Sequence, residues 1–185
     1  METAFRKPGY RNTDAAMAVL RESVARFGIR QVVVASTRGG TGLEAAEMFE
    51  GSKTKVVIVT HNVGFKKPGT LEMYDETRRK IEELGARVLT GTMPFRSIGT
   101  AIREQQAYSQ QDLIANTLRL LGQGTKVCVE IVLMASDAGL ITPEDCLAVA
   151  GTARGADTVA LIKPAPSNRL FELKIRRILA KPSNW

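Results

Sequence analysis

The sequence predicts an α/β protein: an open, mostly parallel sheet of about five strands, with an antiparallel edge strand and helices on both faces. Runs of β-branched residues such as 32–34 and 56–59 are apolar without interruption, which is typical of strands covered on both faces. Amphipathic or charged segments of helical length separate these runs, and this alternation favours a parallel sheet. No repeat or linker divides the chain, so we expect a single domain over residues 1–185.

The first half of the chain begins with a helix that has clear end signals. It is expected to start at Asn12 or Thr13 and to end at Gly28, because apolar residues recur between these positions at helical spacing. The further elements predicted in this half are strands over 31–36, 55–60 and 86–90, and helices over 43–49 and 71–84.

The second half is predicted to continue the alternation. The expected elements are a long helix over 97–121, a fourth strand over 126–134, a helix that begins at Thr142 and Pro143, and a fifth strand over 157–162. The 126–134 segment is assigned to a strand because it is an apolar, β-branched run. Residues 171–180 alternate between apolar and basic side chains, which favours a strand over a helix. The short turn before them predicts an edge strand antiparallel to the fifth, since parallel neighbours need a long crossover.

Composition and charge narrow the classes of partner. The 185 residues carry a net charge of +7, which favours anionic partners. Aromatic residues make up only 5% of the chain, so few side chains can stack on bases, and we expect no nucleic-acid binding. No apolar run approaches the roughly 20 residues that cross a bilayer, and the first residues lack the apolar core of a signal peptide. We therefore expect a cytoplasmic protein with no membrane partner, in which Cys128 and Cys146 are structural thiols.

The segment Ser36–Gly42 is the strongest candidate for a ligand site. It joins an apolar strand to a helix, and a helix N-terminus favours an anion. Its candidate phosphate-binding residues are Ser36, Thr37, Arg38, Gly39, Gly40 and Thr41. The segment matches neither the Walker A pattern nor GxGxxG, so we expect a mononucleotide or a sugar phosphate. The alternative is an ordinary capped turn, in which Thr41 and Glu44 form a capping box.

Further candidates follow the other predicted strands, since ligands of open α/β sheets bind beyond the carboxyl ends of the strands. They are Thr60, His61, Asn62, Gly91, Thr92, Met93, Met134, Ser136, Asp137, Gly139 and Lys163. His61, the single histidine, is either a ligand contact or structural, and no carboxylate close to it in the sequence stands out as its partner. Asp137 either accepts a hydrogen bond from a ribityl or ribose hydroxyl or forms an Asx turn. Lys163 either neutralises a phosphate or is solvated, and Met93 and Met134 either contact a flat ring or fill the core.

Two arginines are candidate anion clamps, although the sequence does not show where they point. They are Arg38 and Arg96.

The chain resembles the C-terminal α/β domain of pyruvate kinase. The resemblance is carried by the order of helix, apolar strand, Ser36–Thr41 and helix, by the strand Val57–Thr60, and by the ending Ala156–Ser167. Over nearly its whole length, the chain is similar to stand-alone pyruvate-kinase α/β-domain-like proteins. That resemblance implies bound flavin mononucleotide (FMN), with the Ser36–Gly42 loop, Thr60–Asn62 and Ser136–Gly139 around it. The chain has no catalytic barrel and has an additional unit over 126–151, so pyruvate kinase activity is not expected.

Two functional hypotheses follow. The first is an FMN-binding protein that holds the phosphate on the 36–42 loop and the ring along the sheet edge, with a flavin-dependent redox role if it is an enzyme. The second is a non-catalytic sensor of a phosphorylated metabolite that acts through a protein partner. The sequence identifies no catalytic residue, which favours binding over catalysis. The unpaired edge of the final strand is a candidate surface for a homo-oligomer.

Overall fold

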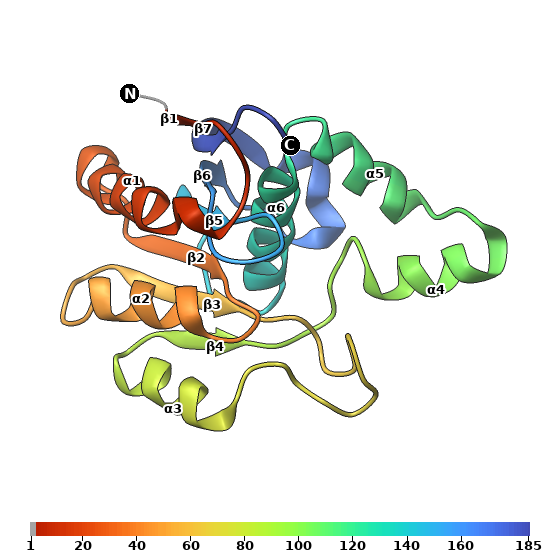
Figure 1. Ribbon diagram of the computed structural model, residues 1–185, viewed down its shortest axis with the longest axis horizontal. Coiled ribbons are helices and arrows are strands. Elements are labelled where there is room, and N and C mark those ends of the chain that lie inside the picture. Colours follow the sequence, from red (N-terminus) through yellow and green to blue (C-terminus); the bar gives the residue numbers. More distant parts are fainter. Residues whose placement is uncertain (1–2) are drawn as a thin grey trace.

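The computed structural model describes residues 3–185 and contains one seven-stranded sheet between layers of helices (Figure 1). The strands are β1 (Thr3–Phe5), β2 (Gln31–Ala35), β3 (Lys55–Val59), β4 (Arg87–Leu89), β5 (Cys146–Ala150), β6 (Thr158–Lys163) and β7 (Lys174–Pro182). Their order across the sheet is β1-β7-β6-β5-β2-β3-β4. Strand β6 is antiparallel to both of its neighbours, and the other pairings are parallel. The predicted fold class is confirmed.

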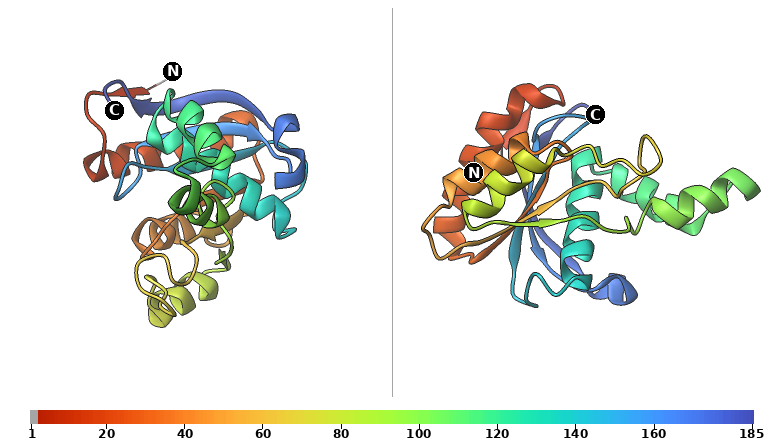
Figure 2. Two further views of the ribbon diagram at one scale, coloured as in Figure 1. Left: turned by 90° about the vertical axis from the view of Figure 1, so that its right-hand side faces the viewer. Right: turned by 90° about the horizontal axis from the view of Figure 1, so that it is seen from below.

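Both faces of the sheet are covered, which explains the uninterrupted apolar runs. One face carries α1 (Thr13–Phe27), α2 (Gly40–Met48) and α3 (Asp75–Glu83), and the other carries α6 (Gln123–Asp137) (Figure 2, right). Successive residues of a strand point to opposite faces. In β2, Val32 and Val34 therefore pack in the core beneath α1–α3, whereas Val33 packs in the core beneath α6. All three valines are fully buried.

The elements predicted for the first half of the chain are present. Helix α1 ends at Gly28, whose φ of 63° is the left-handed conformation that glycine adopts easily after a helix. Strands β2, β3 and β4 are parallel neighbours, so their carboxyl ends meet at one edge of the sheet. Helix α3 begins at Asp75, later than predicted.

The prediction of a strand over residues 126–134 is wrong, because these residues form the middle of α6. Eleven of the fifteen residues of this helix are buried. It lies against the sheet, against α5 (Gln110–Arg119) and against the 3-10 helix η2 (Ser167–Glu172). A helix enclosed in this way has no wide polar face, so its sequence lacks helical periodicity and looks like a buried strand.

Because residues 126–134 form a helix, the strands that follow them differ from the prediction in position and direction. Residues 146–150, in the region predicted to be a helix after Pro143, form β5, which is parallel to β2. Strand β6 is consequently antiparallel to β5, whereas a parallel strand was predicted. The short connection between Ala150 and Thr158 explains the pairing, because a parallel neighbour needs a crossover of a dozen or more residues.

The final strand pairs with its neighbour as predicted, but its direction in the sheet differs from the prediction and it is not a free edge along its whole length. Because β6 is reversed, β7 runs parallel to β5, and the antiparallel strand of the sheet is the internal β6 rather than an edge strand. Strand β7 is antiparallel to β6, as predicted. At its far end, Ala180–Pro182 pair with Thr3–Phe5 of β1, so β1 covers this part of the expected edge.

The predicted helix over 97–121 is two helices, α4 (Ser97–Gln106) and α5. Ala107, with φ of 59°, breaks the helix, and Ser109 caps α5 by accepting a hydrogen bond from the N–H of Asp112. A Cβ at Gly99 would lie 2.7 Å from that of Gln111, so this glycine permits the close approach of the two helices. The pair, called the helical arm below, projects from the body of the protein (Figures 1 and 2). No helix within residues 3–185 is both long and apolar enough to cross a membrane.

Candidate functional site

The loop after β2 leads into a helix N-terminus that has no side-chain cap. Gly39, with φ of 100°, is the N-cap residue of α2, and the helix starts at Gly40. The predicted alternative, a capping box between Thr41 and Glu44, is wrong because the helix begins before Thr41. Within the described chain, the N–H groups of Gly40 and Thr41 find no acceptor. The positive end of the helix dipole is therefore available to a ligand.

Close packing holds this helix end against the sheet. The N–H of Gly42 donates to Ser36 Oγ at 3.0 Å. A Cβ at Gly42 would lie 2.7 Å from Ile58 Cγ2, so only glycine fits between the helix and β3. At Gly39, a Cβ would overlap the side chain of Thr77 on α3.

The loop after β3 supplies a histidine that is hydrogen-bonded on both ring nitrogens. His61 Nδ1 lies 2.8 Å from Glu72 Oε2, and Lys66 Nζ lies 2.8 Å from Glu72 Oε1. His61 Nε2 lies 3.4 Å from Thr37 Oγ1 on the neighbouring loop. Burial by itself would raise the pKa of Glu72, but the hydrogen bonds from Lys66 and His61 lower it below its usual value. Glu72 therefore carries a charge and fixes the orientation of the imidazole.

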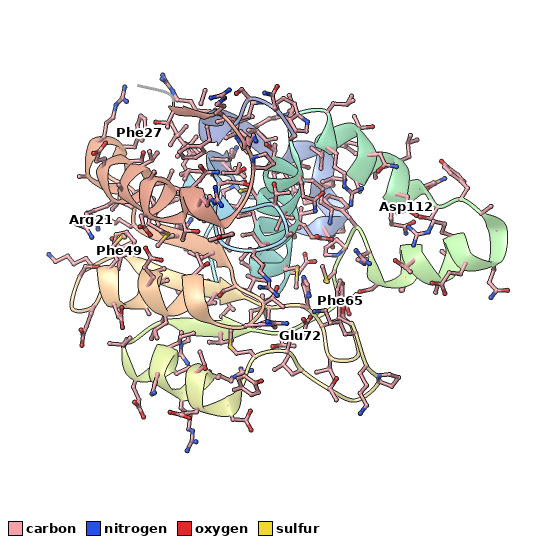
Figure 3. The ribbon with its side chains drawn as sticks, viewed as in Figure 1. Arg21, Phe27, Phe49, Phe65, Glu72 and Asp112 are labelled. Atoms are coloured by element: carbon pink, nitrogen blue, oxygen red, sulfur yellow. The ribbon has the colours of Figure 1, made fainter. Side chains whose placement is uncertain are left out.

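The rings of His61 and Phe65 and the guanidinium of Arg96 form a stack. The centroids of the His61 and Phe65 rings are 3.8 Å apart. The guanidinium carbon of Arg96 lies over the Phe65 ring, 4.6 Å from its centroid. Figure 3 labels Phe65 and Glu72 in this region and Asp112 farther out on the helical arm. The stack places a cation from the loop after β4 beside the loop after β3.

These loops surround a cavity of about 530 Å³, called the sheet-edge cavity below. Its walls come from the loops after β2, β3, β4 and β5, from the sheet, from α6 and from the end of α5. The lining side chains contributed by α6 include Lys126, Glu130 and Met134. The volume falls within the range of pockets that hold small molecules and cofactors.

A buried ion pair forms part of the α6 wall. Lys126 and Glu130, one helical turn apart, form a close salt bridge, and their side chains are only 4% and 1% exposed. The N–H of Phe95 donates to Glu130 Oε1 at 3.0 Å, which ties the loop after β4 to α6. Burial lowers the pKa of Lys126; Glu130 opposes this effect, and the charges of Arg119 and Arg96 add to it.

The charges in the sheet-edge cavity do not balance. Its two carboxylates, Glu72 and Glu130, each form an ion pair with a lysine. The cavity is also lined by Arg38, Arg96, Arg119 and Arg154. No carboxylate within residues 3–185 forms an ion pair with any of these four arginines. The excess of positive charge makes the cavity attractive to anions.

The cavity brings together many, but not all, of the residues singled out in the sequence. Those that line it are Ser36, Thr37, Arg38, Gly40, Thr41, Thr60, His61, Met93 and Met134, together with Arg96. Gly39 supports the loop from outside the cavity. Asn62, Gly91 and Thr92 lie in the expected loops but do not line the cavity, and Asn62 donates to the carbonyl of Val63 at 2.7 Å.

Four predicted site residues lie at the opposite edge of the sheet, which corrects their expected placement. They are Ser136, Asp137, Gly139 and Lys163. The placement of the first three results from α6 being a helix and not a strand, because the C-terminal end of α6 points toward the amino ends of the parallel strands. Lys163 ends the antiparallel β6, whose Ile162 pairs with Cys146 at the start of β5. Asp137 Oδ1 accepts a hydrogen bond from the N–H of Ser167 at 2.7 Å, which connects α6 to η2.

Several cavity residues were missed in the sequence. Phe65, Lys66 and Glu72 are separated from β3 by an irregular loop, and the sequence carries no signal that they fold back toward His61. Residues 151–155 were missed because β5 was not recognised. Lys126 and Glu130 do carry a signal, since opposite charges four residues apart in an apolar run suit one face of a helix.

No protein-family model matches the chain. Among solved structures, it is similar to pyruvate kinase chains from Cryptosporidium parvum. One is 16% identical with a TM-score of 0.43, and the match covers 86% of this chain and 24% of that one. A second, in complex with ADP, has the same identity and TM-score, and the match covers 87% of this chain and 25% of that one. A third is 11% identical with a TM-score of 0.37. The chain thus spans about a quarter of the length of the pyruvate kinase chains that it matches.

Proposed function

We propose that the protein binds FMN, with the phosphate at the N-terminus of α2 and the ring system along the sheet-edge cavity. The observation that carries this proposal is the uncapped helix end at Gly40, which opens into a cavity that holds more cations than anions. A phosphate there completes the hydrogen bonding of the first helical turn and meets the positive end of the helix dipole.

Side chains of two adjacent loops support a phosphate at this point. Arg38 lies on the loop after β2 and Arg154 on the loop after β5, and these two strands are neighbours in the sheet. Neither guanidinium is ion-paired within residues 3–185. Guanidinium groups bind phosphate oxygens in pairs, so both arginines suit this role. Thr37, which precedes Arg38 on the same loop, also lines the cavity.

The rest of the cavity suits a flat ring. Met93, Ile131 and Met134 provide apolar surface, and Phe65 provides an aromatic one. Thioether and aromatic side chains pack well on flat rings. When bound, a flavin supplies redox chemistry, while the protein supplies orientation and polarity.

Comparison of FMN with riboflavin tests the position of the phosphate, because the two differ only in that group. We expect the full-length protein to retain or take up FMN, detected by the flavin absorption band, and to bind riboflavin at least about tenfold more weakly. Folded protein that neither retains nor takes up FMN would overturn the proposal.

The arginines of the phosphate site provide a sharper test. Arg38→Gln and Arg154→Gln should each reduce the preference for FMN over riboflavin. Arg30→Gln is the matched control, because Arg30 is exposed and precedes β2 at the opposite edge of the sheet. An unchanged preference in both cavity variants would place the phosphate elsewhere.

The second candidate function is a non-catalytic sensor of a phosphorylated metabolite, such as a sugar phosphate, that acts through a protein partner. It is favoured by the helical arm, where Ile98 and Leu113 are 67% and 57% exposed. Thermal-shift measurements with FMN, riboflavin and a set of sugar phosphates separate the two candidates, since a ligand selective for the native state stabilises it. Greater stabilisation by a sugar phosphate than by FMN would favour the sensor.

A further inference from the structure

Three cations, Arg96, Arg119 and Lys126, stand where two cavities meet. They are called the arginine–lysine cluster below. All three line the sheet-edge cavity, and all three also line a second cavity of about 380 Å³ beneath the helical arm, called the arm cavity. The cluster belongs to the loop after β4, to the end of α5 and to α6, and so is distinct from the proposed phosphate site on the loops after β2 and β5.

The two arginines of the cluster are held by neutral groups. Arg119 donates from Nε to Gln123 Oε1 and from Nη1 to Asn116 Oδ1, each at 2.7 Å. The Arg96 guanidinium lies over the Phe65 ring. These contacts orient the two groups without neutralising them, so their charge remains available to a ligand.

The third cation, Lys126, is already neutralised, which sets the net charge of the cluster. Its partner Glu130 is buried and also accepts a hydrogen bond from the N–H of Phe95, so each oxygen of this carboxylate already has a partner. The cluster as a whole therefore keeps the two positive charges of Arg96 and Arg119. Their repulsion acts on Lys126 and contributes to lowering its pKa. An anion between the arginines would relieve this repulsion.

The arm cavity supplies space for the body of a ligand. Tyr108 and Leu113 give it an aromatic and an apolar wall. Its single carboxylate, that of Asp112, accepts a hydrogen bond from Arg103 at 3.0 Å. A ligand that fits this cavity has an apolar body and an oxyanion that reaches the cluster.

We propose that the arginine–lysine cluster is a second binding site, for a small organic oxyanion whose carbon body occupies the arm cavity. The head group is a carboxylate or a phosphate monoester, because both match the paired N–H groups of a guanidinium. The site is independent of the flavin proposal. If FMN binds as proposed, the second ligand would approach it from the side of α5.

Three small probes test this site in the full-length protein: benzoate, phenyl phosphate and phenol. They share an aromatic body, and phenol is the neutral control. Binding can be followed by calorimetry and by the fluorescence of Trp185, the single tryptophan, whose indole N–H donates to the carbonyl of Arg119 at 3.0 Å. We expect benzoate or phenyl phosphate to bind and phenol to bind far more weakly. The stronger of the two anions identifies the head group.

Substitutions in the cluster decide whether these residues make the site. Arg96→Gln and Arg119→Gln should each weaken the binding of the anionic probe at least about tenfold. Arg79→Gln is the matched control, since Arg79 is exposed on α3 and should leave the affinity unchanged. Should Arg119→Gln not fold, Arg96→Gln alone decides the matter, because no hydrogen bond to another described residue depends on the Arg96 side chain.

Three results would overturn the proposal. The first is an affinity for the anionic probes no greater than that for phenol, and the second is an affinity equal in the wild type and both cluster variants. The third is loss of the preference for FMN over riboflavin in the cluster variants but not in Arg38→Gln, which would make the cluster the flavin phosphate site. If FMN fails to bind while the anionic probes bind as expected, only the flavin proposal fails.

Discussion

Glu72 Oε2 accepts a hydrogen bond from His61 Nδ1 at 2.8 Å, although the two residues are eleven positions apart in the chain and lie in an irregular loop. Glu72 also accepts from Lys66, so a single carboxylate organises the loop after β3. The contact leaves His61 Nε2 directed toward Thr37 on the loop after β2. The His61 side chain thus connects the loop after β2 with the loop after β3, which form two walls of the sheet-edge cavity.

The charge of Glu72 should make stability depend on pH. Its pKa is lowered in the folded protein, so its ion pairs stabilise the fold above pH 4.5, the usual value for the group, and are lost as the pH falls through the lowered pKa. Glu72→Gln should reduce the free energy of unfolding by about 1 kcal/mol at neutral pH, and the difference from the wild type should shrink in acid. Urea denaturation at pH 7 and below pH 4 measures both values. A difference that grows in acid would contradict the assignment.

Two adjacent glycines of the loop after β2 should respond differently to alanine. At Gly39, positive φ and the overlap with Thr77 predict a loss of about 2 kcal/mol or more for Gly39→Ala. At Gly40, an added Cβ meets nothing within 4 Å, so Gly40→Ala should change stability little. Thermal denaturation of the two variants provides the comparison, with Gly40→Ala as the control. Equal losses would mean that the helix does not begin where the structure shows.

The buried pair on α6 should be far more sensitive to the loss of one partner than of both. Glu130→Gln keeps the acceptor for the N–H of Phe95 but leaves Lys126 buried without an opposite charge. We expect this variant to lose about 3 kcal/mol of stability. The double variant Lys126→Met/Glu130→Gln should regain most of the loss, because it contains no unpaired buried charge. A double-mutant cycle by urea denaturation tests this, and additive losses would argue against the buried pair.

The two thiols should be inert in the native protein. Burial raises the pKa of Cys146 to about 12 and also raises that of Cys128 well above its usual value, and the thiolate is the reactive form. We expect a chromogenic thiol reagent to react with neither cysteine in the folded protein and with both in denaturant. Rapid labelling of the native protein would show that one of them is accessible, against its burial in the structure.

Much of the fold could be predicted because its local signals agree with its tertiary structure. Val32–Val34 form a strand by residue preference as well as by packing, and Gly28 ends the preceding helix in the conformation that glycine favours. The unit of strand, turn and helix at 31–48 was therefore predicted with its candidate site. Residues 126–134 were assigned wrongly because valine and isoleucine favour strands locally, whereas burial on all sides makes the same residues a helix.

The sequence by itself determined the fold class, the first half of the sheet and the position of the 36–42 loop between a strand and a helix, because these depend on local preference and periodicity. Only the tertiary structure decided the direction of β6 and the position of Asp137 and Lys163 at the edge of the sheet opposite the cavity. It also decided that Glu72, Arg119 and Lys126 line the cavity. Such contacts join residues far apart in the chain. They arise from the packing of α6 between the sheet and α5, and no local pattern encodes that arrangement.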